Sequence, residues 1–163
     1  MIAAIVAVNE DWGIGYSGDL LEHIPEDLKY FKKITKDSNV VMGLLTWMSL
    51  PKKPLPDRRN IVIDYVDEVQ FRDGATFEDL ETAVDLMKAF PKESFFVIGG
   101  GSIYKQLLPY CDRVYVTKIH KSHENVDTYF PNLDNMSEWH MISYDGNYTY
   151  NDISYAFTVY EKN

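Results

Sequence analysis

Asp27 is the residue of this sequence best suited to proton chemistry. It lies in the first turn of a predicted helix and follows a glycine-rich apolar segment, which favours an apolar cleft around its carboxylate. Desolvation in such a cleft raises the pKa of a carboxyl group toward the range that proton transfer uses. The alternative is structural, because an acid in the first turn of a helix commonly does no more than complement the helix dipole.

Three consecutive glycines, Gly99 to Gly101, form the second candidate site. They follow the apolar run at residues 95–98, which predicts a buried strand, and precede Ile103, Leu107 and Leu108, whose spacing predicts a helix. Bare backbone at this point lets a flat or anionic ligand approach main-chain N–H groups. The spacing matches neither the dinucleotide fingerprint nor a P-loop, so a plain strand-to-helix turn is the alternative.

Two further groups of polar residues give weaker signals. Arg58 and Arg59 end a proline-rich segment with the densest positive charge of the chain, residues 51–59, and either keep the loop soluble or clamp a ligand carboxylate. His120 and His123 lie close in sequence with Asp127 nearby, but they lack a further ligand. We therefore expect surface histidines and no metal site.

The elements that position these residues alternate between strands and helices. Apolar or alternating runs predict strands at residues 2–8, 39–43, 60–64, 95–98 and 113–120, with a short one at 70–72. Helices are expected at 25–36, 44–50 and 76–90, where Thr76 and Asp79 resemble a capping box. Residues 10–24 predict a loop that folds over something. This alternation predicts a single α/β domain with a largely parallel sheet covered on both faces.

The carboxyl-terminal part of the sequence changes character. Residues 139–144 and 155–161 alternate between apolar and polar side chains and are separated by the stretch DGNYTYNDIS. Such a stretch is typical of a hairpin connection. We therefore expect an antiparallel pair of strands at one edge of the sheet.

Composition narrows the class of protein. The chain has 163 residues, enough for one domain, and 45% of them are hydrophobic. A net charge of -9, from 16 basic and 25 acidic residues, opposes binding to nucleic acid or to an anionic membrane. Cys111 is the only cysteine, so no intrachain disulfide forms. The amino terminus lacks a basic leader region, and we expect a soluble cytoplasmic protein.

Together, several segments resemble the dihydrofolate reductase family over nearly the whole chain. In order, they are IVAVN, WGIGYSGDLL, IPEDLKYFKK, VVMG with LTWMSL, PLPDRRNIV, VIGGGSIY and VDTYFP. The resemblance implies an eight-stranded, mainly parallel twisted sheet with an antiparallel C-terminal hairpin and about four helices. It also implies hydride transfer from NADPH to 7,8-dihydrofolate, which gives the tetrahydrofolate of one-carbon metabolism and thymidylate synthesis.

The resemblance assigns roles to individual residues. Asp27 becomes the sole acid of the pterin site, supported by Thr117, while Leu20 belongs to a mobile loop over the nicotinamide and Arg58 holds the glutamate carboxylate. A cis peptide is expected between Gly99 and Gly100. The implied substrate site comprises Ile5, Val6, Ala7, Asp27, Leu28, Phe31, Leu50, Leu55, Arg58, Ile98, Tyr104 and Thr117. The implied cofactor site comprises Ala7, Ile14, Gly15, Gly43, Leu44, Leu45, Thr46, Asp64, Gly99, Gly100, Gly101, Ser102, Ile103, Tyr104 and Gln106.

This chain departs from the family pattern beside the expected pterin site. Leu21 and Glu22 stand where the family commonly has proline and tryptophan. The substitution removes an indole and brings a second acid close to Asp27. Two neighbouring carboxyl groups raise the pKa of one of them.

A second departure concerns the cofactor. Leu44 and Leu45 replace a basic pair, Ser102 stands where an arginine is frequent, and Asp64 stands where serine is frequent. An acid at a strand end accepts hydrogen bonds from a ribose 2′-hydroxyl and repels a 2′-phosphate. NADPH remains the expected cofactor, and we suspect that NADH is used as well.

Two other functions fit parts of the sequence. A pyrimidine reductase of riboflavin synthesis shares the expected fold, but Asp27 and the PLPDRR segment favour folate. A non-catalytic folate-binding, nucleotide-binding or structural protein that kept the fold is favoured by the missing basic residues and by Glu22. We expect a monomer with dihydrofolate as its small-molecule partner.

Overall fold

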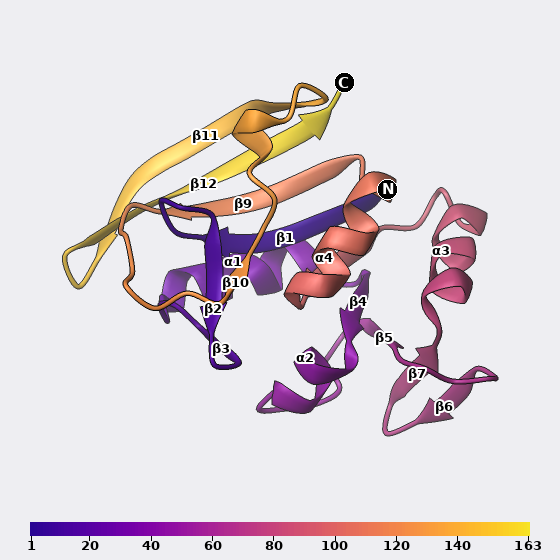
Figure 1. The fold of residues 1–163 in the computed structure, drawn as a ribbon. Coiled ribbons are helices and arrows are strands. Elements are labelled where there is room, and N and C mark those ends of the chain that lie inside the picture. The colour runs from indigo at the N-terminus through magenta and orange to yellow at the C-terminus, as the bar shows by residue number, and fades with distance from the viewer.

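Six parallel strands form the centre of the sheet in the computed structural model, which describes residues 1–163 (Figure 1). In spatial order they are β9 (Arg113–Ile119), β1 (Ile2–Val8), β8 (Phe95–Gly99), β4 (Asn39–Gly43), β5 (Arg59–Ile63) and β7 (Ala75–Glu78). Antiparallel strands extend both edges, with β12 (Ile153–Lys162) and β11 (Trp139–Tyr150) beside β9 and β6 (Gln70–Arg72) beside β7. The expected mainly parallel sheet is confirmed, with nine strands in place of eight because residues 75–78 form β7, where most of them were expected in a helix.

A second, three-stranded sheet lies beside the first. It consists of β2 (Gly13–Tyr16), β3 (Asp19–Leu20) and β10 (Thr128–Tyr129), so the glycine-rich segment expected to be a loop is partly strand. Trp12 anchors its start in the core, with its ring 6.3 Å from that of Phe130 and 5.9 Å from that of Tyr160. Leu20 is the last residue of β3 in this sheet.

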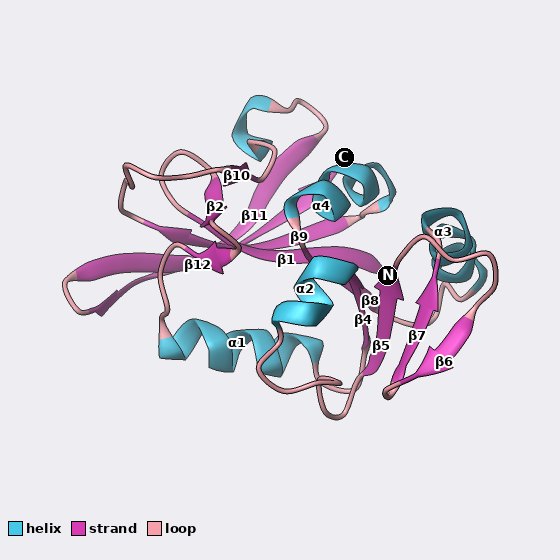
Figure 2. Cartoon of the chain, turned by 60° about the horizontal axis from the view of Figure 1, so that its bottom comes forward, coloured by secondary structure: helices cyan, strands magenta, loops and turns pink.

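Helices cover both faces of the main sheet, as expected (Figure 2). They are α1 (Pro25–Thr35), α2 (Leu44–Ser49), α3 (Leu80–Ala89) and α4 (Gly101–Leu107), with 3₁₀ turns η1 (Leu108–Tyr110) and η2 (Leu133–Asn135). The apolar residues of α1 and α2 pack against one face, and those of α3 and α4 against the other. None of these helices has the length and apolar character that crossing a membrane requires.

The boundaries of α3 correct one expectation. Thr76 does not begin the helix, because it lies in β7 beside Phe77, which is fully buried and pairs with β5. The helix begins after Asp79, whose Oδ1 accepts a hydrogen bond of 2.8 Å from the Thr82 N–H. The acid is therefore the N-cap itself, and the predicted capping box is wrong.

The C-terminal hairpin is longer than expected. Most of the stretch expected to connect its strands is strand, and only Asn151 and Asp152 turn the chain, with φ values of 46° and 64°. Tyr148 explains part of the extension, because its ring stacks on that of Tyr155 at 5.7 Å. Cross-strand aromatic pairs of this kind stabilise antiparallel strands.

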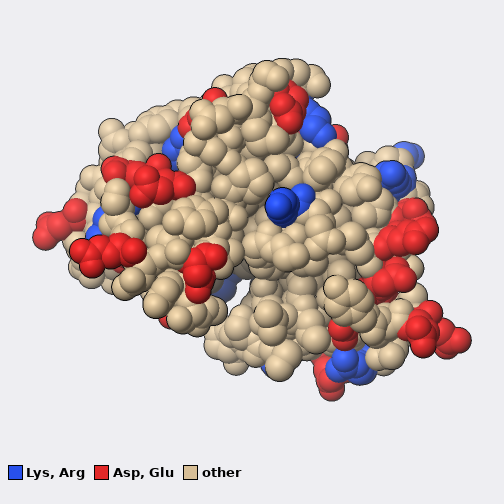
Figure 3. Space-filling model, in the orientation of Figure 1, with Lys and Arg blue, Asp and Glu red and all other residues tan.

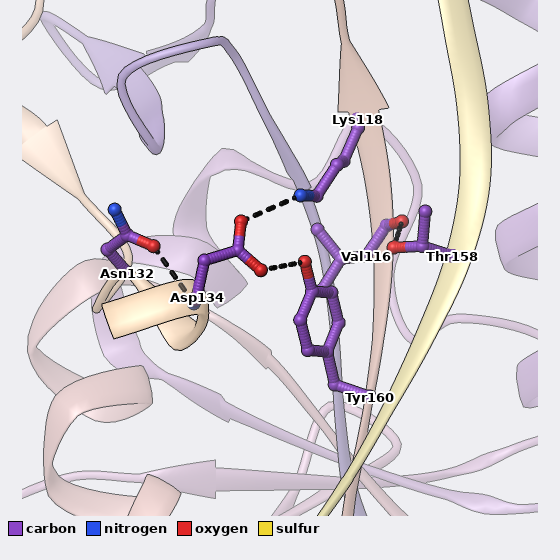
Figure 4. Close-up of polar contacts among 6 residues, drawn as sticks. All are labelled: Val116, Lys118, Asn132, Asp134, Thr158 and Tyr160. Carbon is purple, nitrogen blue, oxygen red and sulfur yellow. Dashed lines mark hydrogen bonds and ion pairs between the residues drawn. The ribbon is translucent and has the colours of Figure 1, made fainter. Parts of the chain in front are cut away.

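A polar cluster fixes the segment after β10 to the main sheet (Figure 4). Asp134 of η2 accepts hydrogen bonds from the Tyr160 hydroxyl at 2.7 Å and from Lys118 Nζ at 3.0 Å. Lys118 Nζ also lies 5.2 Å from the centre of the Trp12 ring. One cluster thus ties η2, β9, β12 and the start of the glycine-rich segment together.

The parallel strands direct their carboxyl ends to one edge of the sheet. β8 lies between β1 and β4, and α4 then leads the chain across β1 to β9. In open α/β sheets, ligands bind outside the carboxyl ends of strands where the strand order reverses in this way. The fold therefore points to the ends of β1, β4 and β8 as the place for a site.

Candidate active site

A cavity of about 440 Å³ lies at this edge, and the molecular surface is hollowed between α2 and the segment that carries β2 and β3 (Figure 3). It is lined by Ile5, Val6, Ala7, Leu20, Glu22, His23, Ile24, Pro25, Asp27, Leu28, Phe31, Thr46, Leu50, Ile98, Tyr104 and Thr117. Ten of these 16 residues are hydrophobic. A flat, mostly apolar ring with a few polar atoms matches such a lining.

Asp27 is held in the wall of the cavity by the start of α1. Pro25 is the first residue of the helix, where its missing N–H costs nothing, and Asp27 follows two residues later in the same turn. Thr117 of β9 donates a hydrogen bond of 2.6 Å to Asp27 Oδ1. Burial raises the pKa of Asp27, and the hydrogen bond from Thr117 opposes that increase. The expected pair of an acid and its supporting hydroxyl is present.

Glu22 also lines the cavity, but its carboxylate has other partners. Its Oε1 accepts hydrogen bonds from Lys121 Nζ and His123 Nε2, both at 2.9 Å. The bond from Lys121, followed by that from His123, lowers the pKa of Glu22 although burial opposes the change. Burial, and not a second carboxylate, therefore explains the raised pKa of Asp27.

The expectation of a surface His123 is wrong, because its side chain is only 13% exposed.

Most of the residues expected around a substrate line the cavity together. Those that do are Ile5, Val6, Ala7, Asp27, Leu28, Phe31, Leu50, Ile98, Tyr104 and Thr117. The buried Tyr104 fixes the cavity floor, because its hydroxyl donates a 2.7 Å hydrogen bond to the Ile5 carbonyl of β1. Burial also raises the pKa of Tyr104, which keeps the hydroxyl protonated.

Arg58 and Leu55 lie outside the cavity lining. Arg58 Nε donates to the Pro56 carbonyl at 2.8 Å and Nη1 donates to Thr35 Oγ1 at 3.1 Å, while the guanidinium lies 5.8 Å from the centre of the Phe31 ring. Because Phe31 forms part of the cavity wall, the guanidinium stands beside the cavity with Nη2 free for a further acceptor. Leu55 packs against the same cluster of apolar side chains.

The glycine turn leaves bare main chain where β8 meets α4. Gly99 has a φ of 127°, and its peptide bond to Gly100 is cis, as the family resemblance implied. A Cβ on Gly101 would lie 2.4 Å from Thr128 Cγ2, and one on Gly43 would lie 2.9 Å from Ile103 Cγ1. The Thr46 hydroxyl faces this turn, 3.4 Å from where a Cβ on Gly100 would be. These residues fit a flat nucleotide with anionic groups, because they offer backbone and a hydroxyl without bulk.

The expected cofactor residues separate into two groups. Ala7, Thr46 and Tyr104 line the cavity, whereas Ile14, Gly15, Gly43, Leu44, Leu45, Asp64, Gly99, Gly100, Gly101, Ser102, Ile103 and Gln106 lie outside its lining. The outer group contains no lysine or arginine. The side chain of Gln106 donates to Ser102 Oγ at 2.8 Å, and Asp64 Oδ1 accepts from the Tyr65 N–H at 2.7 Å.

Sequence reasoning missed three residues of the cavity wall. His23, Ile24 and Pro25 join Leu20 to Asp27 and complete one side of the cavity. The available signal was their position in the chain, because any segment that joins a covering loop to the helix bearing the acid must pass along the site. Glu22, noted only as a departure, is also part of this side.

Known proteins provide an independent comparison with this geometry. The family model described as dihydrofolate reductase matches residues 1–162. The chain belongs to the dihydrofolate reductase family. A dihydrofolate reductase of Bacillus subtilis (strain 168) is 38% identical over 99% of this chain and 95% of its own length. The dihydrofolate reductase of Staphylococcus haemolyticus is 34% identical over 99% of this chain and 95% of its own length. That of Neisseria gonorrhoeae is 38% identical over 82% of this chain and 80% of its own length.

Membership of this family gives the activity. Dihydrofolate reductases transfer a hydride from NADPH to dihydrofolate, and this chain is an oxidoreductase of that kind. The alternatives of a pyrimidine reductase or a non-catalytic relative receive no support from the comparisons. The roles of its individual residues are the subject of the proposals that follow.

Proposed function

We propose that the cavity binds the pterin ring of dihydrofolate and that Asp27 is the acid that anchors and protonates it. The observation that carries this proposal is the buried Asp27 carboxyl, bonded to Thr117 within an otherwise largely apolar lining. An ionised carboxylate accepts charge-assisted hydrogen bonds from the amino and amide edge of a pterin. Its raised pKa also brings it closer to the pH at which it exchanges a proton with the ring.

The other residues orient the reactants and exclude water. The nicotinamide cofactor supplies the hydride when it is bound. Thr117 holds Asp27 Oδ1 in place, and Tyr104 fixes the β1 backbone beneath the ring. Ala7 and Ile98 are apolar lining on two neighbouring strands, and Leu20 comes from the segment that carries β2 and β3. Closure of such a largely apolar cavity over the reactants expels water, which prevents side reactions and strengthens the hydrogen bonds of Asp27.

The direct test is dihydrofolate-dependent oxidation of NADPH by the purified chain, followed by the absorbance of the reduced cofactor. We expect turnover with dihydrofolate and none with the diaminopyrimidine substrate of the riboflavin pathway. Turnover with the second substrate alone would favour the pyrimidine reductase. Tight dihydrofolate binding without turnover would favour a non-catalytic protein.

We also propose that Arg58 binds the glutamate tail of dihydrofolate. The guanidinium stands beside Phe31 at the cavity wall, and its Nη2 has no protein acceptor. A charged hydrogen bond contributes about 1.5 to 3 kcal/mol, so Arg58→Ala should weaken dihydrofolate binding by about 10- to 150-fold. A pterin without the tail is the matched control and should bind almost unchanged. Equal losses for both ligands would show that Arg58 only supports its loop through Pro56 and Thr35.

We infer that NADH is used appreciably beside NADPH. Leu44, Leu45, Asp64 and Ser102 supply no cation for a 2′-phosphate, and Asp64 adds a negative charge at the end of β5. Each absent charged contact removes about 1.5 to 3 kcal/mol of preference. The test is the ratio of kcat/KM for NADPH to that for NADH, in the wild type and in Asp64→Ser. A wild-type ratio above about 10², unmoved by the substitution, would contradict the inference.

We further propose that the protein acts as a monomer in the cytoplasm. The exposed edge strand β11 carries two register irregularities and the charged Asp145, features that oppose pairing with a second copy. Cys111 is buried, and burial raises the pKa of its thiol to about 12, so it does not form disulfides readily. Sedimentation at micromolar concentration tests the monomer, and a dimer would contradict it.

A further inference from the structure

The segment Lys121–His123, which follows β9, is bonded to both ends of residues 10–22, which carry β2 and β3. We call residues 10–22 the covering segment, because Leu20 and Glu22 line the active-site cavity from it. At the first end, the Glu10 N–H donates to the Lys121 carbonyl at 3.1 Å, and Ser122 Oγ donates to Glu10 Oε2 at 3.2 Å. At the second end, Lys121 and His123 both donate to Glu22. Figure 1 shows the chain after β9 passing beside the segment that carries β2 and β3. Both ends of the covering segment are therefore held by three consecutive residues.

The hydrogen-bond partners assign the tautomer of His123. Asn9 Oδ1 accepts from the Asp11 N–H at 2.9 Å and from the Gly13 N–H at 2.8 Å, so the amide Nδ2 of Asn9 faces His123 Nδ1 at 3.1 Å. Because Nδ2 only donates, Nδ1 is the acceptor and the proton of the neutral ring lies on Nε2. Nε2–H then donates to Glu22 Oε1 at 2.9 Å. One directional chain of bonds runs from the backbone at residues 11 and 13 to the carboxylate of Glu22.

The Glu22–His123 contact is better shielded from solvent than the other ion-pair contacts of the molecule. The side chains of Glu22 and His123 are 19% and 13% exposed, whereas those of Arg72 and Asp73 are 46% and 70% exposed. Exposed pairs of the second kind contribute little, because water and salt screen them. Because less water surrounds the Glu22–His123 contact, the attraction between its groups is stronger, and the contact can hold the covering segment in place.

Two cavities meet at this contact. Glu22 lines the active-site cavity, whereas Lys121 and His123 line a second cavity of about 550 Å³ between residues 16–21 and 121–125. Leu20 lines both cavities. The contact therefore lies between the two cavities, two residues along the chain from Leu20.

We propose that Glu22 is a positioning residue, which, through Lys121 and His123, latches the covering segment in the position that places Leu20 over the active-site cavity. The kinetic consequence rests on the proposed function, whereas the structural consequence does not. Release of Glu22 loosens the second end of the segment and, through His123 and Asn9, the first, while the pairing of β2 with β10 still holds its middle.

The structural test is amide hydrogen exchange in the protein without ligands. Glu22→Gln keeps the size of the side chain and removes its charge, and we expect exchange at Asp11 and Gly13 to become about tenfold faster. Asp73→Asn, which removes the charge of an exposed pair on the far edge of the sheet, is the matched control and should leave both amides unchanged. Unchanged exchange in Glu22→Gln would overturn the proposal, whether or not the chain proves to be a reductase.

The kinetic test separates positioning from stability. In single turnovers, Glu22→Gln should slow the hydride step about tenfold while the Kd for dihydrofolate changes less than about threefold. Lys121→Met should give a smaller loss of the same kind, and the double variant should be no slower than Glu22→Gln, because both residues act through one contact. Additive losses in the double variant, or a loss confined to dihydrofolate binding, would overturn the proposal.

Discussion

At the scale of single residues, Asp27 meets two opposing demands. Burial in a largely apolar cavity makes its ionised form costly to the fold, and the same burial brings its pKa closer to the pH of proton transfer. The short hydrogen bond from Thr117 stabilises the ionised form of Asp27 and so offsets part of the cost of its burial. The position of Asp27 in the cavity wall was predictable from the sequence, because a place in a first helical turn after a glycine-rich segment is a local property. Its role as the catalytic acid remains a proposal.

Asp27→Asn is expected to lower turnover by about 10² to 10⁴ at neutral pH, the usual contribution of a placed acid or base. The loss should shrink as the pH falls, because dihydrofolate that is already protonated needs less help. Steady-state kinetics from acidic to neutral pH measure both effects. Near wild-type turnover at neutral pH would place proton delivery elsewhere, with Glu22 the first residue to examine.

The same substitution should stabilise the fold at neutral pH. The pKa of Asp27 is raised above its ordinary value of 3.8, so the folded state binds the proton more tightly than the unfolded state does. Stability from this group is complete below that value and declines as the pH rises through the raised pKa. Asp27→Asn should therefore have a higher Tm than the wild type at pH 7, and the difference should close below about pH 4.

Glu26→Gln provides the control for this stability measurement. Glu26 lies next to Asp27 in the same helical turn, but it pairs with Lys29 and is 59% exposed. Removing its charge should change the Tm little at any pH. An Asp27→Asn variant less stable than the wild type at pH 7 would show that the hydrogen bond with Thr117 outweighs the burial of the charge.

At the scale of elements, local patterns predicted the types of element and missed contacts made far along the chain. The apolar runs that became β1, β4 and β8 were recognisable because central strands are apolar throughout. The start of α3 was misplaced because Thr76 and Asp79 fit a helix start locally, whereas Phe77 is committed to the sheet by its pairing with β5. The small sheet was missed because β2 pairs with β10, more than 110 residues away.

The contact between α4 and β10 gives a prediction at this scale. A Cβ on Gly101 would lie 2.4 Å from Thr128 Cγ2, so Gly101→Ala forces the start of α4 away from the small sheet. Overpacking of this kind costs about 1 to 3 kcal/mol in the free energy of unfolding, which chemical denaturation measures. Gly101 does not have a positive φ, so an alanine is otherwise acceptable there.

Thr128→Ser tests whether that methyl group is the cause. It removes Cγ2 and keeps the hydroxyl, which donates to Asp127 Oδ1 at 2.9 Å. In the double variant, most of the stability lost in Gly101→Ala should return, because the clash has gone. Additive effects of the two substitutions would show that Gly101 is required for another reason.

At the scale of the whole molecule, charge sets how an anionic cofactor approaches. The net charge is -9, and acidic side chains gather on both flanks of the hollowed face (Figure 3). The sequence alone gives the net charge. It does not give the distribution of the acidic side chains over the surface, because that depends on how the loops fold. The field of such a surface repels an anion before any contact is made.

Added salt should therefore speed the association of NADPH, the reverse of what an electrostatically steered enzyme shows. The Debye length falls from about 30 Å at 0.01 M to about 8 Å at 0.15 M ionic strength, which screens the flanking acids. The quenching of the three tryptophans in a stopped-flow instrument can report the rate. NADH, which lacks the 2′-phosphate, is the matched control and should respond less. An NADPH association rate that falls with salt would instead reveal a local cationic field, with Lys52, Lys53 and Lys105 as its candidate sources.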